Sequence, residues 1–151
     1  MTIKKSSRGV EDADLRRYYK YLKLKRWDAN YYHVANELPA TTPQQKRFAA
    51  TLVHKGKKPG FSDIVILESH QGYGALFIEL KIKPGVASMA QLAFLSNVNN
   101  NGYLGCVAFG YDEAVKITNW YMSDSKDPMP LYKRTRTASK IKFENVLEVV
   151  K

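Results

Sequence analysis

Three residues have the types and spacing of a site that hydrolyses phosphodiesters: Asp63, Glu79 and Lys81. They stand at the ends of two short apolar runs joined by a glycine-containing loop, which predicts a β-hairpin or two adjacent strands. Because side chains alternate along a strand, Glu79 and Lys81 should face one way and Leu80 should face the core. Two carboxylates beside an ammonium group favour a hard cation, and such an ion can activate water against a phosphodiester.

The same residues also have a simpler interpretation. A glutamate and a lysine two residues apart on an exposed strand commonly form a solvated ion pair. Glu79, however, lies inside the apolar run 75–80, where an unpaired carboxylate is costly. This cost favours a function for Glu79.

The elements expected around these residues alternate along the chain. Helices are predicted at 11–26, 42–55, 88–99 and 111–122, and strands at 31–35, 63–67, 75–81 and 104–109, whereas 141–150 fits a strand or a short helix. This order of helix, strand, helix, strand, strand, helix, strand, helix predicts an α/β domain with a mixed sheet flanked by helices.

The helix starts carry the clearest local signals. Thr42 with Gln45 and Ser88 with Gln91 have the spacing of capping boxes. The first helix is expected to open on three acids, which suit the positive end of its dipole, and to bury four apolar residues at helical spacing. The acids are Glu11, Asp12 and Asp14, and the expected buried residues are Leu15, Tyr18, Tyr19 and Leu22.

The length of 151 residues and a hydrophobic content of 44% predict one globular domain over 1–151, with a core at about 11–122 and a basic extension at about 125–151. No apolar run reaches the roughly 20 residues that span a bilayer, and the N-terminus lacks the apolar segment of a secretory signal. The single cysteine, Cys106, lies in an apolar run and is expected to be buried. We therefore expect a cytoplasmic protein that does not bind membranes.

The net charge of +10 is concentrated in two segments, 16–26 and 133–142. Clustered cations favour a polyanionic partner, and nucleic acid is the obvious one. The alternative is a basic surface that only confers solubility.

Several motifs in order resemble the VRR-NUC (virus-type replication-repair nuclease) branch of the PD-(D/E)xK nuclease superfamily. They are PGFSD at 59–63, IELK at 78–81, SMAQ at 88–91, YHVANE at 32–37, KGKKPG at 55–60, and GY at 102–103 leading to FGYDEA at 109–114. The resemblance covers about 11–122 and implies a restriction-endonuclease-like core.

The resemblance also implies roles for individual residues. Asp63 and Glu79 would bind Mg²⁺ or Mn²⁺, with the carbonyl of Leu80 as a further ligand and Glu11 as an acid from the first helix. Lys81 would orient or help deprotonate the attacking water, or offset charge on the phosphate. Nucleic acid would be bound by six cations: Arg16, Arg17, Lys20, Lys57, Lys58 and Lys83.

Four positions leave alternatives open. Glu37 competes with Glu11 for the third carboxylate, and Leu15 stands where the family has a glutamine one turn after Glu11. Ser62 replaces the proline that usually precedes the motif aspartate. Gln91 suits either a catalytic position facing the site or a helix cap, and His33 suits either a phosphate contact or a structural role. The four positions concerned are Glu37, Ser62, Gln91 and His33.

Members of this branch that stand alone resemble phage enzymes that cut branched DNA such as Holliday junctions as dimers. The resemblance therefore implies a metal-dependent DNA endonuclease that acts as a homodimer on branched or duplex DNA. The alternatives are a noncatalytic nucleic-acid-binding protein and a nuclease acting on flaps or single strands, for which the tyrosines at 18–32 could stack bases.

Overall fold

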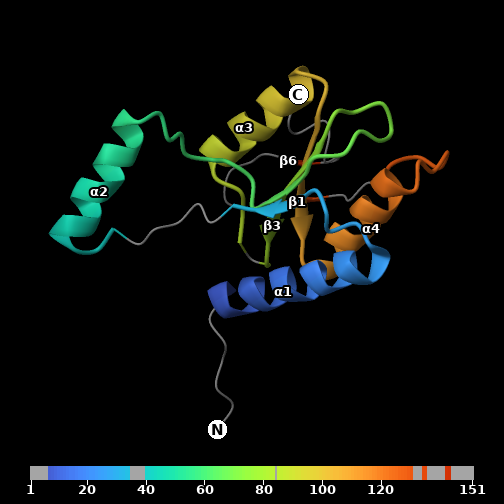
Figure 1. Ribbon diagram of the computed structural model, residues 1–151, viewed down its shortest axis with the longest axis horizontal. Coiled ribbons are helices and arrows are strands. Elements are labelled where there is room, and N and C mark those ends of the chain that lie inside the picture. The colour runs from blue at the N-terminus through green and yellow to red at the C-terminus, as the bar shows by residue number, and fades with distance from the viewer. Residues whose placement is uncertain (1–6, 35–39, 84, 131–133, 136–141, 144–151) are drawn as a thin grey trace, which may run out of the picture.

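The computed structural model describes residues 7–34, 40–83, 85–130, 134–135 and 142–143. Its elements follow the predicted order of helices and strands, as Figure 1 shows. They are α1 (Ser7–Lys25), β1 (Tyr31–His33), α2 (Pro43–His54), β2 (Ile64–Ile66), β3 (Leu76–Lys81), α3 (Met89–Asn100), β4 (Leu104–Phe109), α4 (Tyr111–Met122), β5 (Arg134–Thr135) and β6 (Lys142–Phe143).

Strands β1 to β4 form a mixed sheet in the order β1-β2-β3-β4. The β1–β2 and β2–β3 pairs are antiparallel, and the β3–β4 pair is parallel. A parallel pair needs a crossover connection, which α3 supplies between β3 and β4. The predicted hairpin of β2 and β3 is confirmed, and its turn is closed by hydrogen bonds between His70 and Tyr73.

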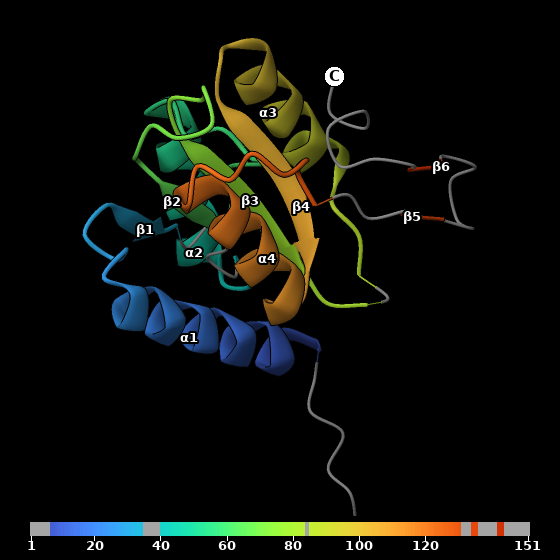
Figure 2. The same cartoon turned by 90° about the vertical axis from the view of Figure 1, so that its right-hand side faces the viewer.

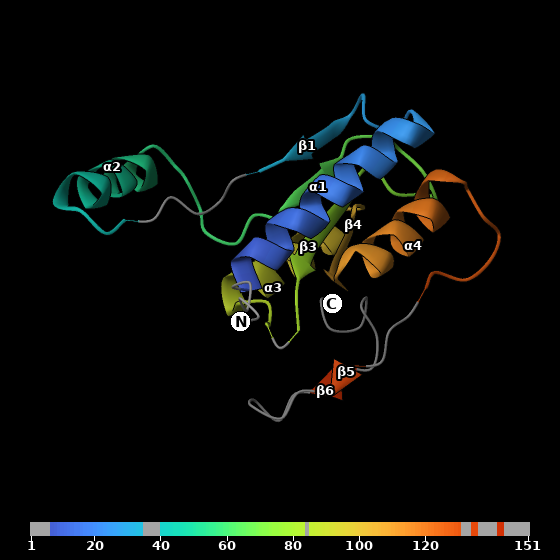
Figure 3. The same cartoon turned by 90° about the horizontal axis from the view of Figure 1, so that it is seen from below.

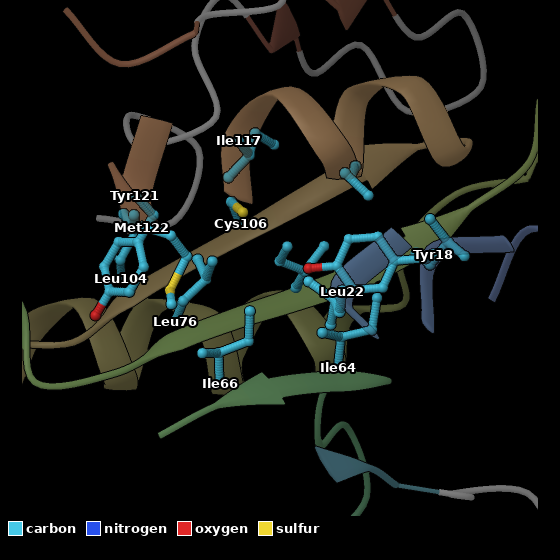
Figure 4. Packing of buried hydrophobic residues seen from close by; sticks show 14 of the residues in the cluster. Tyr18, Leu22, Ile64, Ile66, Leu76, Leu104, Cys106, Ile117, Tyr121 and Met122 are labelled. Carbon is cyan, nitrogen blue, oxygen red and sulfur yellow. The ribbon is translucent and has the colours of Figure 1, made fainter. Parts of the chain in front are cut away.

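Helices cover both faces of the sheet (Figure 2). On one face the sheet packs against Tyr18 and Leu22 of α1 and against Ile117 and Tyr121 of α4, together with the buried thiol of Cys106 (Figure 4). On the other face a smaller cluster joins the sheet to α3. The predicted α/β fold with a flanked mixed sheet is therefore confirmed, and Cys106 is buried as expected.

Alternation along β3 decides which face carries the polar residues. Leu76, Ile78 and Leu80 belong to the core on the α1 and α4 side, whereas Phe77 belongs to the cluster on the α3 side. Glu79 and Lys81 follow Phe77 at steps of two, so they continue its row on the α3 face. The strand therefore delivers both charged side chains beside the start of α3.

The two predicted capping boxes are present. Thr42 caps α2 and Ser88 caps α3, and in each case the glutamine three residues later returns a hydrogen bond to the backbone of the cap. Because these signals are local, both helices begin where the sequence indicates.

The prediction for the first helix was wrong in two respects. The helix begins at Ser7, so its acids lie beyond the first turn and do not open it. Asp14 instead accepts a hydrogen bond of 3.0 Å from the backbone N–H of Tyr111, at the start of α4. Tyr19 is 40% exposed, because the buried stripe passes through Tyr18 and Leu22. The helix ends where Arg26 adopts a left-handed backbone (φ 58°).

Helix α2 differs from the other three long helices in its surroundings. It buries none of its residues and extends away from the sheet in two perpendicular views (Figures 1 and 3). The remaining expectations concern the C-terminal part, where Arg134–Thr135 pairs with Lys142–Phe143. Most of the expected element at 141–150 lies outside the described residues. Within the described residues, no helix combines the length and apolar character needed to cross a membrane.

Candidate active site

The side chain of Glu79 is the centre of the polar group on the α3 face. Glu79 lies in an apolar strand and is 0% exposed, although a glutamate side chain is ordinarily charged at neutral pH. Its Oε1 is 2.6 Å from Nζ of Lys81 and also accepts a hydrogen bond from Nε2 of Gln91. Its Oε2 is buried and receives no hydrogen bond within the described residues. One carboxylate oxygen is therefore held by two donors, and the other is buried without a donor in this part of the chain.

Asp63 reaches the same strand from the neighbouring one. The β2–β3 pairing ends at Ile64 opposite Ile78, so the edge of β3 beyond Ile78 is not covered by β2. Asp63 occupies that place, and its Oδ2 accepts a hydrogen bond of 3.0 Å from the backbone N–H of Leu80. Within a strand, the N–H and C=O of one residue point to the same edge. The carbonyl of Leu80 therefore faces the edge where Asp63 lies.

The backbone of Asp63 is held in turn by β1. Its carbonyl accepts hydrogen bonds from the backbone N–H of Val34 at 3.1 Å and from Nδ1 of His33 at 2.8 Å. Of the two roles considered for His33, the structure shows the structural one: its imidazole orients the backbone that carries Asp63.

Burial and the neighbouring charge of Asp63 change the ionisation of Glu79. Burial raises the pKa of Glu79 to about 8, and the charge of Asp63 adds to this effect, while the hydrogen bond and charge of Lys81 oppose it. The Asp63 and Glu79 side chains are also close enough to share a hydrogen bond. A buried carboxylate whose charged form is opposed by a neighbouring carboxylate is a site at which a cation would be favoured.

The pKa of Lys81 moves in the direction that keeps its charge. Burial alone would lower the pKa of Lys81, but the hydrogen bond and charge of Glu79 and the charges of Asp63 and Glu11 together raise it. The charge of Glu11, on the first helix, thus also acts on Lys81. A lysine held as an ammonium group suits contact with an anion.

Gln91 occupies both of the positions that the sequence left open, a helix cap and a place facing the site. Its backbone N–H and side-chain oxygen form the capping box with Ser88, at 3.2 Å and 2.7 Å. The amide nitrogen of the same side chain donates to Glu79. Gln91 therefore fixes the start of α3 and faces the site at the same time.

Gly60 brings the chain before Asp63 close to the same helix start, a contact that the sequence analysis missed. Its φ is +90°, and a Cβ added there would lie 2.3 Å from the carbonyl oxygen of Ala90 and 2.8 Å from the backbone nitrogen of Gln91. Only glycine permits this conformation and this approach together. The Pro59-Gly60 pair, which belongs to the PGFSD motif, was the available signal, but the motif alone does not indicate this contact.

These residues fit a divalent cation. The unpartnered Oε2 of Glu79, the adjacent carboxylate of Asp63 and the carbonyl edge of Leu80 are oxygen donors of the kind that Mg²⁺ and Mn²⁺ prefer. Within the described residues no three Asp, Glu, His or Cys side chains form a metal-binding group, and Glu11 is connected to this pair through the effect of its charge on Lys81. Glu37 lies outside the described residues.

The structure separates the predicted nucleic-acid-binding residues into different regions. Arg16, Arg17 and Lys20 are exposed on α1, which packs on the face opposite α3. Nη1 of Arg17 is 3.7 Å from Oδ1 of Asp14, and its guanidinium group stacks over the ring of Tyr111. The other three cations are also exposed: Lys57 and Lys58 precede Gly60, and Lys83 follows β3.

Ser62, which stands where the family has a proline, is fully buried and its Oγ has no hydrogen-bond partner in the described structure. The backbone still delivers Asp63 to the edge of β3. The substitution therefore leaves the position of the aspartate intact.

Comparison with known proteins supports the fold. No family model and no curated protein matches the chain. A solved structure described as "VRR_NUC domain protein" matches with a TM-score of 0.66 and 21% sequence identity, over 77% of this chain and 90% of that chain. The resemblance drawn from the sequence motifs is therefore confirmed at the level of the fold.

Proposed function

We propose that this chain, which has the fold of a VRR_NUC domain protein, is a nuclease that uses a divalent metal ion to cut DNA internally. The observation that carries the proposal is the pair of carboxylates formed by the half-buried Asp63 and the fully buried Glu79. Within the described residues one oxygen of Glu79 receives no hydrogen bond, and the lysine beside it is held as a cation. A buried carboxylate oxygen without a partner is costly in a structure that only needs to fold.

Each residue has a role that its contacts support. Asp63, Glu79 and the carbonyl of Leu80 would hold Mg²⁺ or Mn²⁺, with Glu11 as an acid that acts at longer range. When bound, the ion would neutralise phosphate oxygens and make water a better nucleophile at neutral pH. Lys81 would offset the charge that develops on the phosphate, and Gln91 would keep Glu79 oriented through its hydrogen bond.

The substrate that we propose is branched DNA, cut by a homodimer whose two sites are related by a twofold axis. This part depends on the resemblance of the sequence to phage enzymes that stand alone. Light scattering at working concentration tests the dimer, and a strictly monomeric chain would remove the junction-resolving version while leaving nuclease activity. A panel of linear, flap and four-way DNA substrates tests the selectivity.

A second candidate, cleavage of single strands or flaps, is favoured by two exposed aromatic side chains. Tyr32 is 51% exposed on β1, and Tyr19 is 40% exposed and stacks on Tyr31 at 5.4 Å between ring centroids. Exposed aromatic rings can stack unpaired bases. Tyr18, in contrast, is fully buried and cannot contribute. Preferential cutting of flaps in the substrate panel, reduced by Tyr32→Ala, would favour this candidate.

The decisive experiment is nicking of supercoiled DNA by the purified chain with Mg²⁺ or Mn²⁺. We expect nicking that requires the metal and is lost in Asp63→Ala. A noncatalytic nucleic-acid-binding protein would bind the same DNA, show no metal-dependent nicking, and respond little to this substitution. Nicking that persists in Asp63→Ala would point to a contaminant or to another site and would refute the proposal.

A further inference from the structure

Helix α2 and the loop that follows it, residues 43–58, form a projection that we call the cationic arm. The helix is specified strongly by its own sequence, with a complete capping box at Thr42 and a proline at its first position. Nevertheless it buries no residue and extends away from the sheet (Figures 1 and 3). A helix of 12 residues is marginal in water without tertiary contacts. A partner outside the chain would supply those contacts.

The charge of the arm has one sign. From residue 40 to residue 62 there are five lysines and arginines and no aspartate or glutamate: Lys46, Arg47, Lys55, Lys57 and Lys58. All five are exposed. Lys46, Arg47 and His54 lie on one side of α2, because residues four and eight apart repeat on one face and Arg47 adjoins that row. A partner that covers this face must therefore be anionic.

The arm is attached directly to the candidate active site. Two residues after the end of the arm, the backbone of Gly60 lies against Ala90 and Gln91 at the start of α3. Three residues later, Asp63 binds the backbone of Leu80. A strand of nucleic acid whose phosphate reached Asp63 and Glu79 would therefore pass the root of the arm.

We propose that the cationic arm binds the phosphate backbone of duplex DNA beside the cleavage site and so extends the contact beyond the site itself. This inference rests on the proposed nuclease function. The 12 residues of α2 span about 18 Å at 1.5 Å per residue. That length corresponds to about five base pairs at 3.4 Å per pair. The arm therefore adds contacts along about half a turn of the helix.

Two exposed apolar side chains of α2 raise the alternative of a second copy of this chain as the partner. Phe48 and Val53 are 54% and 63% exposed. Charge argues against pairing of two arms, since each carries five cations and no acid over residues 40–62. The same charge is complementary to phosphate. The observations therefore favour DNA, and the second copy becomes an outcome of the test.

The test measures DNA binding by the full chain in the Asp63→Ala background over a range of salt concentrations. The variant K46A/R47A removes two charges from the arm, and K116A/K126A removes two charges from exposed lysines outside it. Each phosphate contact contributes about 0.9 to the slope of log K against log salt. K46A/R47A should therefore lower the slope by about 1.8, and K116A/K126A should leave it unchanged.

Shortening the DNA provides a second readout. Removing about five base pairs from the flank that the arm contacts should weaken binding of the unmodified arm. The same shortening should reduce the DNA affinity of K46A/R47A much less, because this variant has already lost its contacts with that flank. This coupling would not arise if the variant had merely destabilised the fold.

Three results would overturn the inference about the arm. They are an unchanged salt slope in K46A/R47A, an equal loss of slope in K116A/K126A, and conversion of a dimer to a monomer by Phe48→Ser, which would identify a second copy as the partner of the arm. In each case metal-dependent nicking by the wild-type chain would leave the nuclease proposal standing. Failure of the wild-type chain to bind or nick DNA even at low salt would instead refute the nuclease proposal.

Discussion

Replacing Glu79 by glutamine should change how the stability of the protein depends on pH. In the folded protein, burial and the charge of Asp63 raise the pKa of Glu79 from its ordinary value of 4.5 to about 8. Between these values the folded state binds one proton more than the unfolded state. The free energy of unfolding is therefore highest below the unfolded pKa and falls as the pH rises toward the folded pKa. Glutamine has nearly the shape of the protonated side chain and does not titrate.

The magnitude follows from the number of protons. One extra proton in the folded state changes the free energy of unfolding by 2.303RT per pH unit, which is about 3 kcal/mol between about pH 5.5 and pH 7.5. For a chain of this length, 1 kcal/mol corresponds to about 2–4 °C in Tm. Across that interval the Tm of the wild type should therefore fall relative to that of Glu79→Gln by about 6–12 °C.

The assay is thermal unfolding of both proteins in the presence of a chelator over this pH range. Using the difference between the two proteins cancels the titration of all other groups that they share. Adding Mg²⁺ should then raise the Tm of the wild type more at high pH than at low pH, because a ligand carboxylate must be deprotonated. Glu79→Gln should gain little. Parallel Tm profiles for the two proteins would refute the reasoning, because they would mean that Glu79 ionises as readily in the fold as in the unfolded chain.

The other predictions concern single residues around the site. Lys81→Ala should lower nicking by about 10²–10⁴-fold while leaving DNA binding nearly intact, and a parallel loss of both would contradict its assigned role. Gly60→Ala should destabilise the fold by about 2–5 kcal/mol, since φ is +90° and the new Cβ meets backbone. Gly56→Ala, with φ +91° and open space around it, should cost only about 1 kcal/mol in the same denaturant titration. Asp14→Ala removes the acceptor at the start of α4 and should cost about 1 kcal/mol, whereas Asp12→Ala, on the exposed side of α1, should change the unfolding free energy by less than about 0.5 kcal/mol.

Local signals explain why most elements could be predicted. The capping boxes at Thr42 and Ser88 depend on residues three positions apart, so the sequence alone determines where α2 and α3 begin. The prediction of where α1 begins was wrong for the converse reason. Its acids suit a helix N-terminus, but nothing between Ser7 and Glu11 stops the helix from extending one turn further. Charge near a helix end is a weaker signal than a hydrogen-bonded cap.

The contact between Asp63 and β3 depends on information that no single segment contains. Alternation along one strand suffices to predict that Glu79 and Lys81 lie together, and the 2.6 Å between Oε1 of Glu79 and Nζ of Lys81 confirms this prediction. The hydrogen bond from Leu80 to Asp63 also requires β2 to stop pairing at Ile64. Where a strand pair ends is decided by the whole sheet. The projection of α2 is likewise invisible in its sequence, since a capped amphipathic helix usually packs against its own domain.

Gln91 shows how a structural signal and a functional one can occupy the same side chain. A glutamine at the third position of a capping box uses only its oxygen, which accepts from the backbone of Ser88. Its amide nitrogen remains to donate, and the parallel register of β3 and β4 around α3 places Glu79 within its reach. The cap therefore fixes the donor that holds Glu79. In consequence Gln91→Glu should keep the cap but place a second negative charge next to Glu79. This substitution separates the two roles of the side chain. Circular dichroism should show that the helices remain folded, whereas nicking should fall.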